Sequence, residues 1–481
     1  MNLLARAMTI GRKRKFFLLV TSAILFAVAA IIPEQATSPL RWYGMLLPGK
    51  LILLFLCLIF LVIYISQSKS LLQKRMSFVF NRTTLILFLG LMSASYLIKS
   101  FYFNKGLFHY AIDKGLDTAS YFIQARIFAE GHINVPSHEL REFFQTGYCI
   151  NNGKYFSKYP PGWPAILSLG ILLKLPWIVN PVLTCLSLGV IYILGVRLYG
   201  HETAWIATIF TGFSPLVIWG SSSYFSEPAS LLFSTLFFYA AVRSLESPNL
   251  VFPMLAGSCL GIAFLVRPYS AVAISLPILA YWLANLARQP KLIRRGALLL
   301  LSFLPVSALY FVYNYYQTGS LLLSPFEYYN PFDKPGFGLR SNDTFITPSY
   351  FGPLSALKNL AVGLIGLNWY GLPLLFLFVL SAMIGPRRKW DLLLCFTVMS
   401  IIVFYSFYFF RSSGRYYYPA LFAIFLLSAR GVIELERFLK VHLRIPSLRS
   451  LNVFLVLFLV LSSLVLISTP EYINGVRRQN M

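Results

Sequence analysis

Long runs without any charged residue constrain this sequence more than any other feature. Leu51–Ile65 and Val453–Ile467 are two of them, and similar runs recur along the 481 residues. A helix that crosses the ~30 Å hydrocarbon core of a bilayer needs roughly 20 predominantly apolar residues. Only 12% of the residues are charged, whereas soluble domains carry about 25%. We therefore expect an all-α, polytopic integral membrane protein that is surrounded by membrane lipids.

The formal net charge of +25 would be compatible with a nucleic-acid-binding protein, but the distribution of the charges excludes that class. The cations form short clusters between apolar runs, which is the positive-inside pattern of membrane proteins. The sequence has no basic–aromatic repeats of the kind that single-strand binders use. We expect anionic lipid headgroups, and no nucleic acid, as the partner of these cations.

Thirteen transmembrane helices fit the apolar runs if the N-terminus is cytoplasmic. The predicted spans are residues 16–32, 46–65, 85–103, 178–197, 203–220, 228–243, 250–266, 270–287, 296–314, 360–384, 391–410, 416–433 and 451–468. This register places every strong basic cluster, for example Arg387–Lys389, on the cytoplasmic side. The first span could also be a cleaved signal peptide, although we favour a retained anchor. The expected location is the inner or plasma membrane of a bacterium.

One apolar segment, Trp163–Leu175, is too short for a full span, and counting it as one would invert every later loop. We interpret it as a re-entrant or surface-lying segment on the outer, periplasmic side. A single transmembrane domain over residues 1–480 then has two long outer loops with surface helices, 104–162 and 315–358, which hold eight of the 16 acidic residues. The spans have almost no central acid, and this argues against an ion-coupled pump or symporter.

The first outer loop contains an expected amphipathic helix over Leu116–Gly131, which begins at Asp117. As a helix cap, Asp117 would contribute ~1 kcal/mol, and periodicity alone favours this role over catalysis. The two roles are compatible because a carboxylate at a helix N-terminus is held ionised, and a general base has to be ionised.

Four motifs occur in an order that is similar to a known family. Asp117 is followed by Tyr121 and by A-R-x-x-A-x-G, and then come KYPPGW (Lys158–Trp163), LVRP (Leu265–Pro268) and GRYYYPAL (Gly414–Leu421). Over roughly residues 100–435 the chain resembles the GT-C superfamily of membrane glycosyltransferases. Within that superfamily it resembles glycosyltransferase family 39 and the related aminoarabinose and mannosyl transferases. Many of these have a second acid where Thr118 stands, so the sugar and the acceptor stay open.

The resemblance implies a polyprenyl-phosphate-linked sugar donor, bound from the outer leaflet, and inversion at the anomeric carbon. Asp117 would be the general base that takes the proton of an acceptor hydroxyl on a glycan, lipid or protein. The donor phosphate needs cations, and Arg267, Arg411 and Arg415 lie at predicted outer span ends. For any one of these arginines, an interfacial anchor is an equally good interpretation. No cofactor is expected, and no residues have metal-ligand spacing.

Further residues near the motifs are candidates for lining the substrate cavity. They are Tyr121, Lys158, Tyr159, Glu227, Tyr269 and Tyr416. Glu227 could be a second acid or contact the acceptor, although a Glu before Pro is also ordinary at a helix start. The aromatic segment Thr318–Gly338 suggests a lid or acceptor-binding loop, with a packed cap as the alternative.

Two other functions compete with a transferase. An outer-leaflet polysaccharide ligase or polymerase also uses lipid-linked sugars, but its large loop would be expected late in the chain, with Arg or His instead of an early Asp. A lipid-linked sugar flippase or other transporter would be expected to have charged residues along the mid-membrane path and pseudo-repeats, and the sequence has neither.

Overall fold

The computed structural model describes residues 82–114, 117–144, 146–341, 347–371, 375–383, 385–386, 389–409 and 414–443. Helices account for most of these residues. The predicted spans at 16–32, 46–65 and 451–468 lie outside the described residues. The long helices are α4 (Arg82–Lys114), α7 (Val179–Tyr199), α10 (Glu227–Glu246), α11 (Val251–Val266), α12 (Pro268–Asn285), α13 (Lys291–Thr318), α17 (Lys389–Ser406) and α18 (Leu421–Leu443).

One predicted span is bent within the described residues, and another changes its helix type. The span expected at 203–220 consists of α8 (His201–Phe213) and α9 (Pro215–Ser221), which meet at 61°. Pro215 explains the break, because the residue before a proline is displaced from helical geometry. The span expected at 360–384 contains the end of α15 (Pro353–Gly366), a π-helical segment at Leu367–Gly371 and α16 (Leu375–Ser381).

Five helices in the described part of the chain are long and apolar enough to cross a membrane, and a sixth is added if α8 and α9 form one bent span. The architecture is therefore that of an integral membrane protein. The count of thirteen spans stays a prediction. One boundary differs clearly from the sequence-based expectation: the helix predicted at 85–103 continues to Lys114 and takes up the start of the first outer loop.

The centre of the bundle is α18. Its residues Leu421–Ala429 are almost wholly buried, and it packs against α8, α16 and α17. Phe422 lies with its ring centroid 5.2 Å from that of Phe238 in α10. The short 3₁₀ segment Gly414–Ala420 leads directly into α18, so any side chain on that segment is held by the best-packed helix of the described structure.

The helices α11 and α13 approach each other closely at Gly257. A Cβ atom added there would collide with the Leu299 carbonyl oxygen and with the Ser302 hydroxyl. We expect Gly257→Ala to destabilise the protein by about 1–3 kcal/mol, because backbone cannot yield as a flexible side chain can. Thermal melting in detergent measures the loss. Gly189→Ala in α7 is the matched control, since nothing lies within 4 Å of its added Cβ, and equal melting of the two variants would contradict the expectation.

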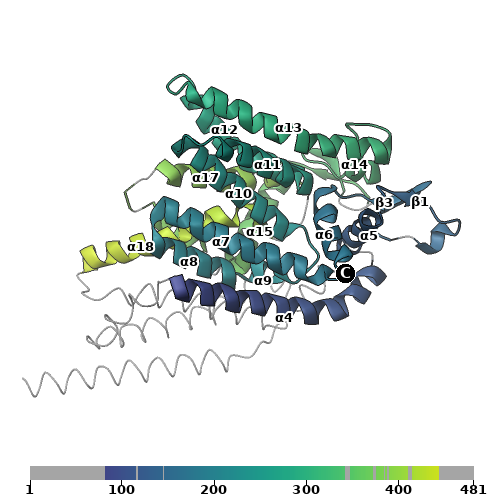
Figure 1. Ribbon diagram of the computed structural model, residues 1–481, viewed down its shortest axis with the longest axis horizontal. Coiled ribbons are helices and arrows are strands. Elements are labelled where there is room, and N and C mark those ends of the chain that lie inside the picture. Colours follow the sequence, from purple (N-terminus) through teal and green to yellow (C-terminus); the bar gives the residue numbers. More distant parts are fainter. Residues whose placement is uncertain are drawn as a thin grey trace, which may run out of the picture.

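The elements of the two predicted outer loops gather at one end of the bundle (Figure 1). There lie α5 (Asp117–Ala129), α6 (Gly162–Leu172), α14 (Pro325–Tyr329) and a small antiparallel sheet of order β1-β3-β2, formed by Val135–Pro136, Lys154–Ser157 and Cys149–Asn152. In the register, Val135 and Asn151 lie opposite Tyr155. The turn between α12 and α13 lies at the other end of the bundle (Figure 1).

The segment Trp163–Leu175 forms no span. Its helix α6 has 11 residues, about 16 Å at 1.5 Å per residue, which is half of what a bilayer core requires. Trp163 is fully buried, and its indole N–H donates to the Tyr224 carbonyl at 2.8 Å. The helix therefore packs into the same end of the bundle as α5.

Candidate active site

Four charged residues from four separate elements meet at this end of the bundle. Asp117 is the first residue of α5 and Glu227 the first of α10. Arg267 lies at the break between α11 and α12, where Pro268 favours the extended backbone that Arg267 adopts. Arg415 lies in the 3₁₀ segment that precedes α18. Helix ends at one face of a bundle thus position the whole set.

The four residues form one continuous chain of ion pairs. Arg415 Nη2 lies 2.7 Å from Asp117 Oδ2, and Arg415 Nε lies 3.0 Å from Glu227 Oε1. The same Glu227 oxygen lies 2.7 Å from Arg267 Nη2. Glu227 is fully buried, whereas the Asp117 side chain keeps 19% of its surface exposed. Asp117 is therefore the carboxylate of the chain that solvent or a substrate can reach.

The turn before Glu227 is fixed by its own hydrogen bonds. The Asn180 amide donates to the carbonyls of Ser223 and Phe225, the latter at 2.9 Å. Arg267 Nε donates to the Ser226 hydroxyl at 2.9 Å, and the Tyr121 hydroxyl lies 3.4 Å from the same oxygen. Such supporting contacts hold a site in the geometry that its chemistry needs.

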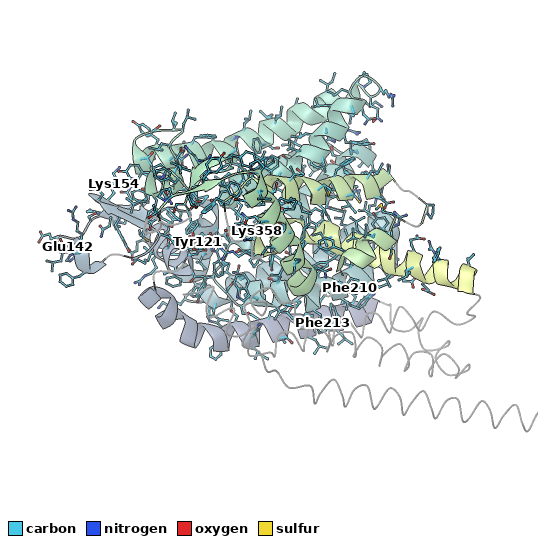
Figure 2. The ribbon with its side chains drawn as sticks, turned by 180° about the vertical axis from the view of Figure 1, so that it is seen from behind. Tyr121, Glu142, Lys154, Phe210, Phe213 and Lys358 are labelled. Carbon is cyan, nitrogen blue, oxygen red and sulfur yellow. The ribbon has the colours of Figure 1, made fainter. Side chains whose placement is uncertain are left out.

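Tyr121 also connects the ion pairs to the aromatic residues of the first loop. Its ring centroid lies 4.3 Å from that of Tyr159, a residue that helps to lower the pKa of Asp117. Figure 2 places Tyr121 between the peripheral residues Glu142 and Lys154 and the helical body that contains Phe210. The site thus lies where the loop elements meet the bundle.

The pKa of Asp117 is lower than that of an ordinary aspartate. Burial alone would raise it, but the Arg415 guanidinium, by charge and by its hydrogen bond, outweighs burial. The charge of Lys158 and the Tyr159 hydrogen bond lower the pKa further. Asp117 is accordingly ionised near neutral pH and can accept a proton.

A family model and two solved structures show what this chain is similar to. Residues 159–311 match the family model described as dolichyl-phosphate-mannose-protein mannosyltransferase. The structure is similar to that of ArnT from Cupriavidus metallidurans bound to undecaprenyl phosphate, with a TM-score of 0.53 and 15% identity over 80% of this chain and 77% of that chain. This chain has a GT-C fold. The apo structure of the same ArnT gives a TM-score of 0.51 and 15% identity over 80% and 76% of the two chains. None of the curated protein sequences matches the chain significantly.

The resemblance expected from the four motifs is thereby confirmed, and the GT-C fold brings most of the predicted residues together. Asp117, Glu227, Arg267 and Arg415 form the ion-pair chain, and Tyr121 contacts it through Ser226. Arg411 lies outside the described residues.

The other candidate cavity residues lie at different distances from this ion-pair chain. The Arg415 guanidinium carbon lies 5.8 Å from the Tyr416 ring centroid. The Tyr269 hydroxyl donates to the Phe404 carbonyl at 2.6 Å. Lys158 pairs with Asp333 of the second loop, with 3.8 Å between Nζ and Oδ2.

Sequence reasoning did not single out Asp333, Ser226 or Tyr408 as residues of the site. The Tyr408 hydroxyl donates to Asp333 Oδ1 at 2.5 Å. The available signal was the aromatic, Pro/Gly-punctuated segment around Asp333, which suggested a functional loop without indicating which residue it would bring to the site. Among the described residues, no three His, Cys, Asp or Glu side chains are grouped so that they could hold a metal ion.

Proposed function

We propose that this protein is a glycosyltransferase that moves a sugar from a polyprenyl-phosphate-linked donor to an acceptor hydroxyl, with inversion, on the outer face of the membrane. The observation that carries the proposal is the Asp117–Arg415–Glu227–Arg267 chain at the end of the bundle that holds both long loops. The matched family is a lipid-phosphate-sugar transferase by description, and the ArnT structure was solved with undecaprenyl phosphate. The proposal takes residues 1–480 as one domain with a cytoplasmic N-terminus.

The residues supply what one displacement step requires. The acceptor oxygen attacks the anomeric carbon and forms the new bond, while its proton passes to the Asp117 carboxylate. The bond between the anomeric carbon and the phosphate oxygen breaks, and its electron pair stays on the phosphate. Attack opposite to the leaving group inverts the carbon. The leaving phosphate is already an anion, so no second carboxylic acid is needed, in contrast to glycosidases.

Arg415 links donor binding to the strength of the base. In the structure it is shared between Asp117 and Glu227. A donor phosphate that binds Arg267 and Arg415 competes with these carboxylates for the same N–H groups. As Arg415 turns towards the phosphate, Asp117 loses part of its strongest counter-charge, and its affinity for a proton increases. The base thus becomes stronger when the donor is present.

Identification of the bound lipid tests this proposal. We expect mass spectrometry of the purified protein to detect a polyprenyl phosphate, and the protein to transfer label from a radiolabelled polyprenyl-phosphate sugar to an acceptor in a membrane extract. Binding of the lipid-linked sugar, with its passage across vesicles but without any transfer, would instead favour a flippase. A protein that neither binds nor uses such lipids would contradict the proposal.

A further inference from the structure

Asp333, in the second outer loop, is a buried carboxylate close enough to Asp117 for the two charges to interact. Its residue is 7% exposed, and its backbone N–H donates to the Asn330 carbonyl at 3.0 Å. Its carboxylate accepts the Tyr408 hydrogen bond and pairs with Lys158. A buried carboxylate with a hydroxyl donor and a cation is costly to maintain unless its partners are held in place.

Lys158 is held in place by aromatic rings from both loops. Its residue is 3% exposed, and Nζ lies 4.0 Å from the Tyr148 ring centroid, 4.6 Å from that of Phe326 and 5.0 Å from that of Tyr329. The faces of such rings attract a cation. Tyr148 comes from the first loop, whereas Phe326 and Tyr329 come from α14 in the second. The ammonium group therefore has little freedom to leave this position.

From that position Lys158 acts on both carboxylates. It is the ion-pair partner of Asp333, and its charge also lowers the pKa of Asp117. The two carboxylates in turn repel each other. A change in the charge of Asp333 therefore changes the pKa of Asp117, because Lys158 interacts with both carboxylates.

We propose that Asp333 is a positioning residue for the transfer reaction, which must be ionised so that Lys158 is neutralised and Asp117 keeps its strength as a base. This inference rests on the proposed function. When Asp333 takes up a proton, the uncompensated charge of Lys158 acts on Asp117, which then binds the acceptor proton less strongly.

The titration of Asp333 falls in a range where it can be measured. Burial raises its pKa to about 6, against the opposing effects of Lys158 and of the Tyr408 hydrogen bond, with repulsion from Asp117 raising it further. The titratable groups that face Asp333 are Lys158, Tyr408 and Asp117, together with the aromatic rings around Lys158. Its neighbour Lys334 is exposed to solvent. The active form is the ionised one, so the rate is full above this pKa and falls as the pH is lowered through it. Asp117 titrates lower.

The experiment measures kcat/KM against pH, because this ratio reports the free enzyme. For wild type we expect an acid limb near pH 6. For Asp333→Asn we expect the limb to vanish and the plateau to fall by about tenfold, less than the roughly 100- to 10,000-fold that a base itself supplies. For Tyr408→Phe we expect the limb to move to higher pH, because the carboxylate loses a stabilising hydrogen bond. Lys334→Gln, beside Asp333 in the same loop, should leave both the rate and the limb unchanged.

Three results would overturn the inference: an acid limb that persists in Asp333→Asn, a full plateau in that variant, or an unmoved limb in Tyr408→Phe. If Asp333→Asn fails to fold in a thermal melt, the shift in Tyr408→Phe decides alone, since a purely structural role would not move a pH profile. Failure of the proposed function is distinguishable, because wild type would then show no transfer at any pH.

Discussion

Asp117→Asn is expected to lower sugar transfer by roughly 100- to 10,000-fold, the range that a positioned general base contributes, while binding of the lipid-linked donor is retained. Asparagine has nearly the same shape and still accepts a hydrogen bond from Arg415, which lies 2.7 Å from Asp117. It cannot take up the proton of the acceptor hydroxyl. Because Arg415 loses one of its two counter-charges, the donor phosphate should bind at least as tightly as in wild type.

The measurement compares single-turnover transfer with equilibrium binding of polyprenyl phosphate to the same preparation. Glu142→Gln is the matched control: it removes an acid from the same outer loop, but Glu142 is exposed and lies at the periphery (Figure 2). It should transfer at the wild-type rate. Full transfer by Asp117→Asn would exclude Asp117 as the base, and loss of both transfer and lipid binding would point to a structural role instead.

Glu227→Gln is expected to reduce the free energy of unfolding by about 3–5 kcal/mol, the usual cost of removing one partner of a buried ion pair. Glu227 is fully buried and is paired with both Arg267 and Arg415. Its neutralisation leaves two guanidinium groups that face each other with only Asp117 as a counter-charge. A phosphate can replace the missing charge, so added polyprenyl phosphate should restore more thermal stability to this variant than to wild type.

The matched control is Glu246→Gln at the other end of α10. Glu246 pairs with Arg197 at the same distance of 2.7 Å, but the Arg197 side chain is 46% exposed. An exposed pair of this kind contributes about 0–1 kcal/mol, and lipid should not rescue its loss preferentially. If the melting temperature falls equally in the two variants, the buried ion pairs of Glu227 contribute no more to stability than the exposed pair of Glu246. If polyprenyl phosphate does not restore the stability of Glu227→Gln, Glu227 has no part in donor binding.

The parts of the site that could be predicted from sequence are those that a local signal marks. Asp117 is the kind of residue that is favoured at a helix N-terminus. Arg267 directly precedes a helix and Arg415 lies at the start of one, each in a recognisable motif. The helices α7, α11 and α12 follow from uninterrupted apolar runs, so their observed bounds lie close to the predicted spans.

What could not be predicted depends on packing between distant segments. No local pattern reports that Lys158 of the first loop lies among rings of the second, or that Asp333 is its counter-ion. The role of Glu227 shows the same limit. From sequence, a second acid and an ordinary helix start were equally favoured, and only the assembled bundle reveals a carboxylate enclosed by two arginines. Pro215 lies at the break between α8 and α9, but the apolar run continues across it, so hydropathy alone predicts one unbroken span.

The attachment of Arg415 to the head of α18 gives the two halves of the site unequal freedom to change. The side proposed to bind the donor phosphate is anchored through Arg415 to α18, the most deeply buried helix of the described structure. The other side is built from α14 and the small sheet, which belong to the outer loops and lie at the end of the bundle (Figure 1). On the proposed function, exchange of α14 and the sheet changes the acceptor that can reach Asp117 and leaves the proposed phosphate contacts of Arg267 and Arg415 in place. One scaffold could in this way serve many acceptors.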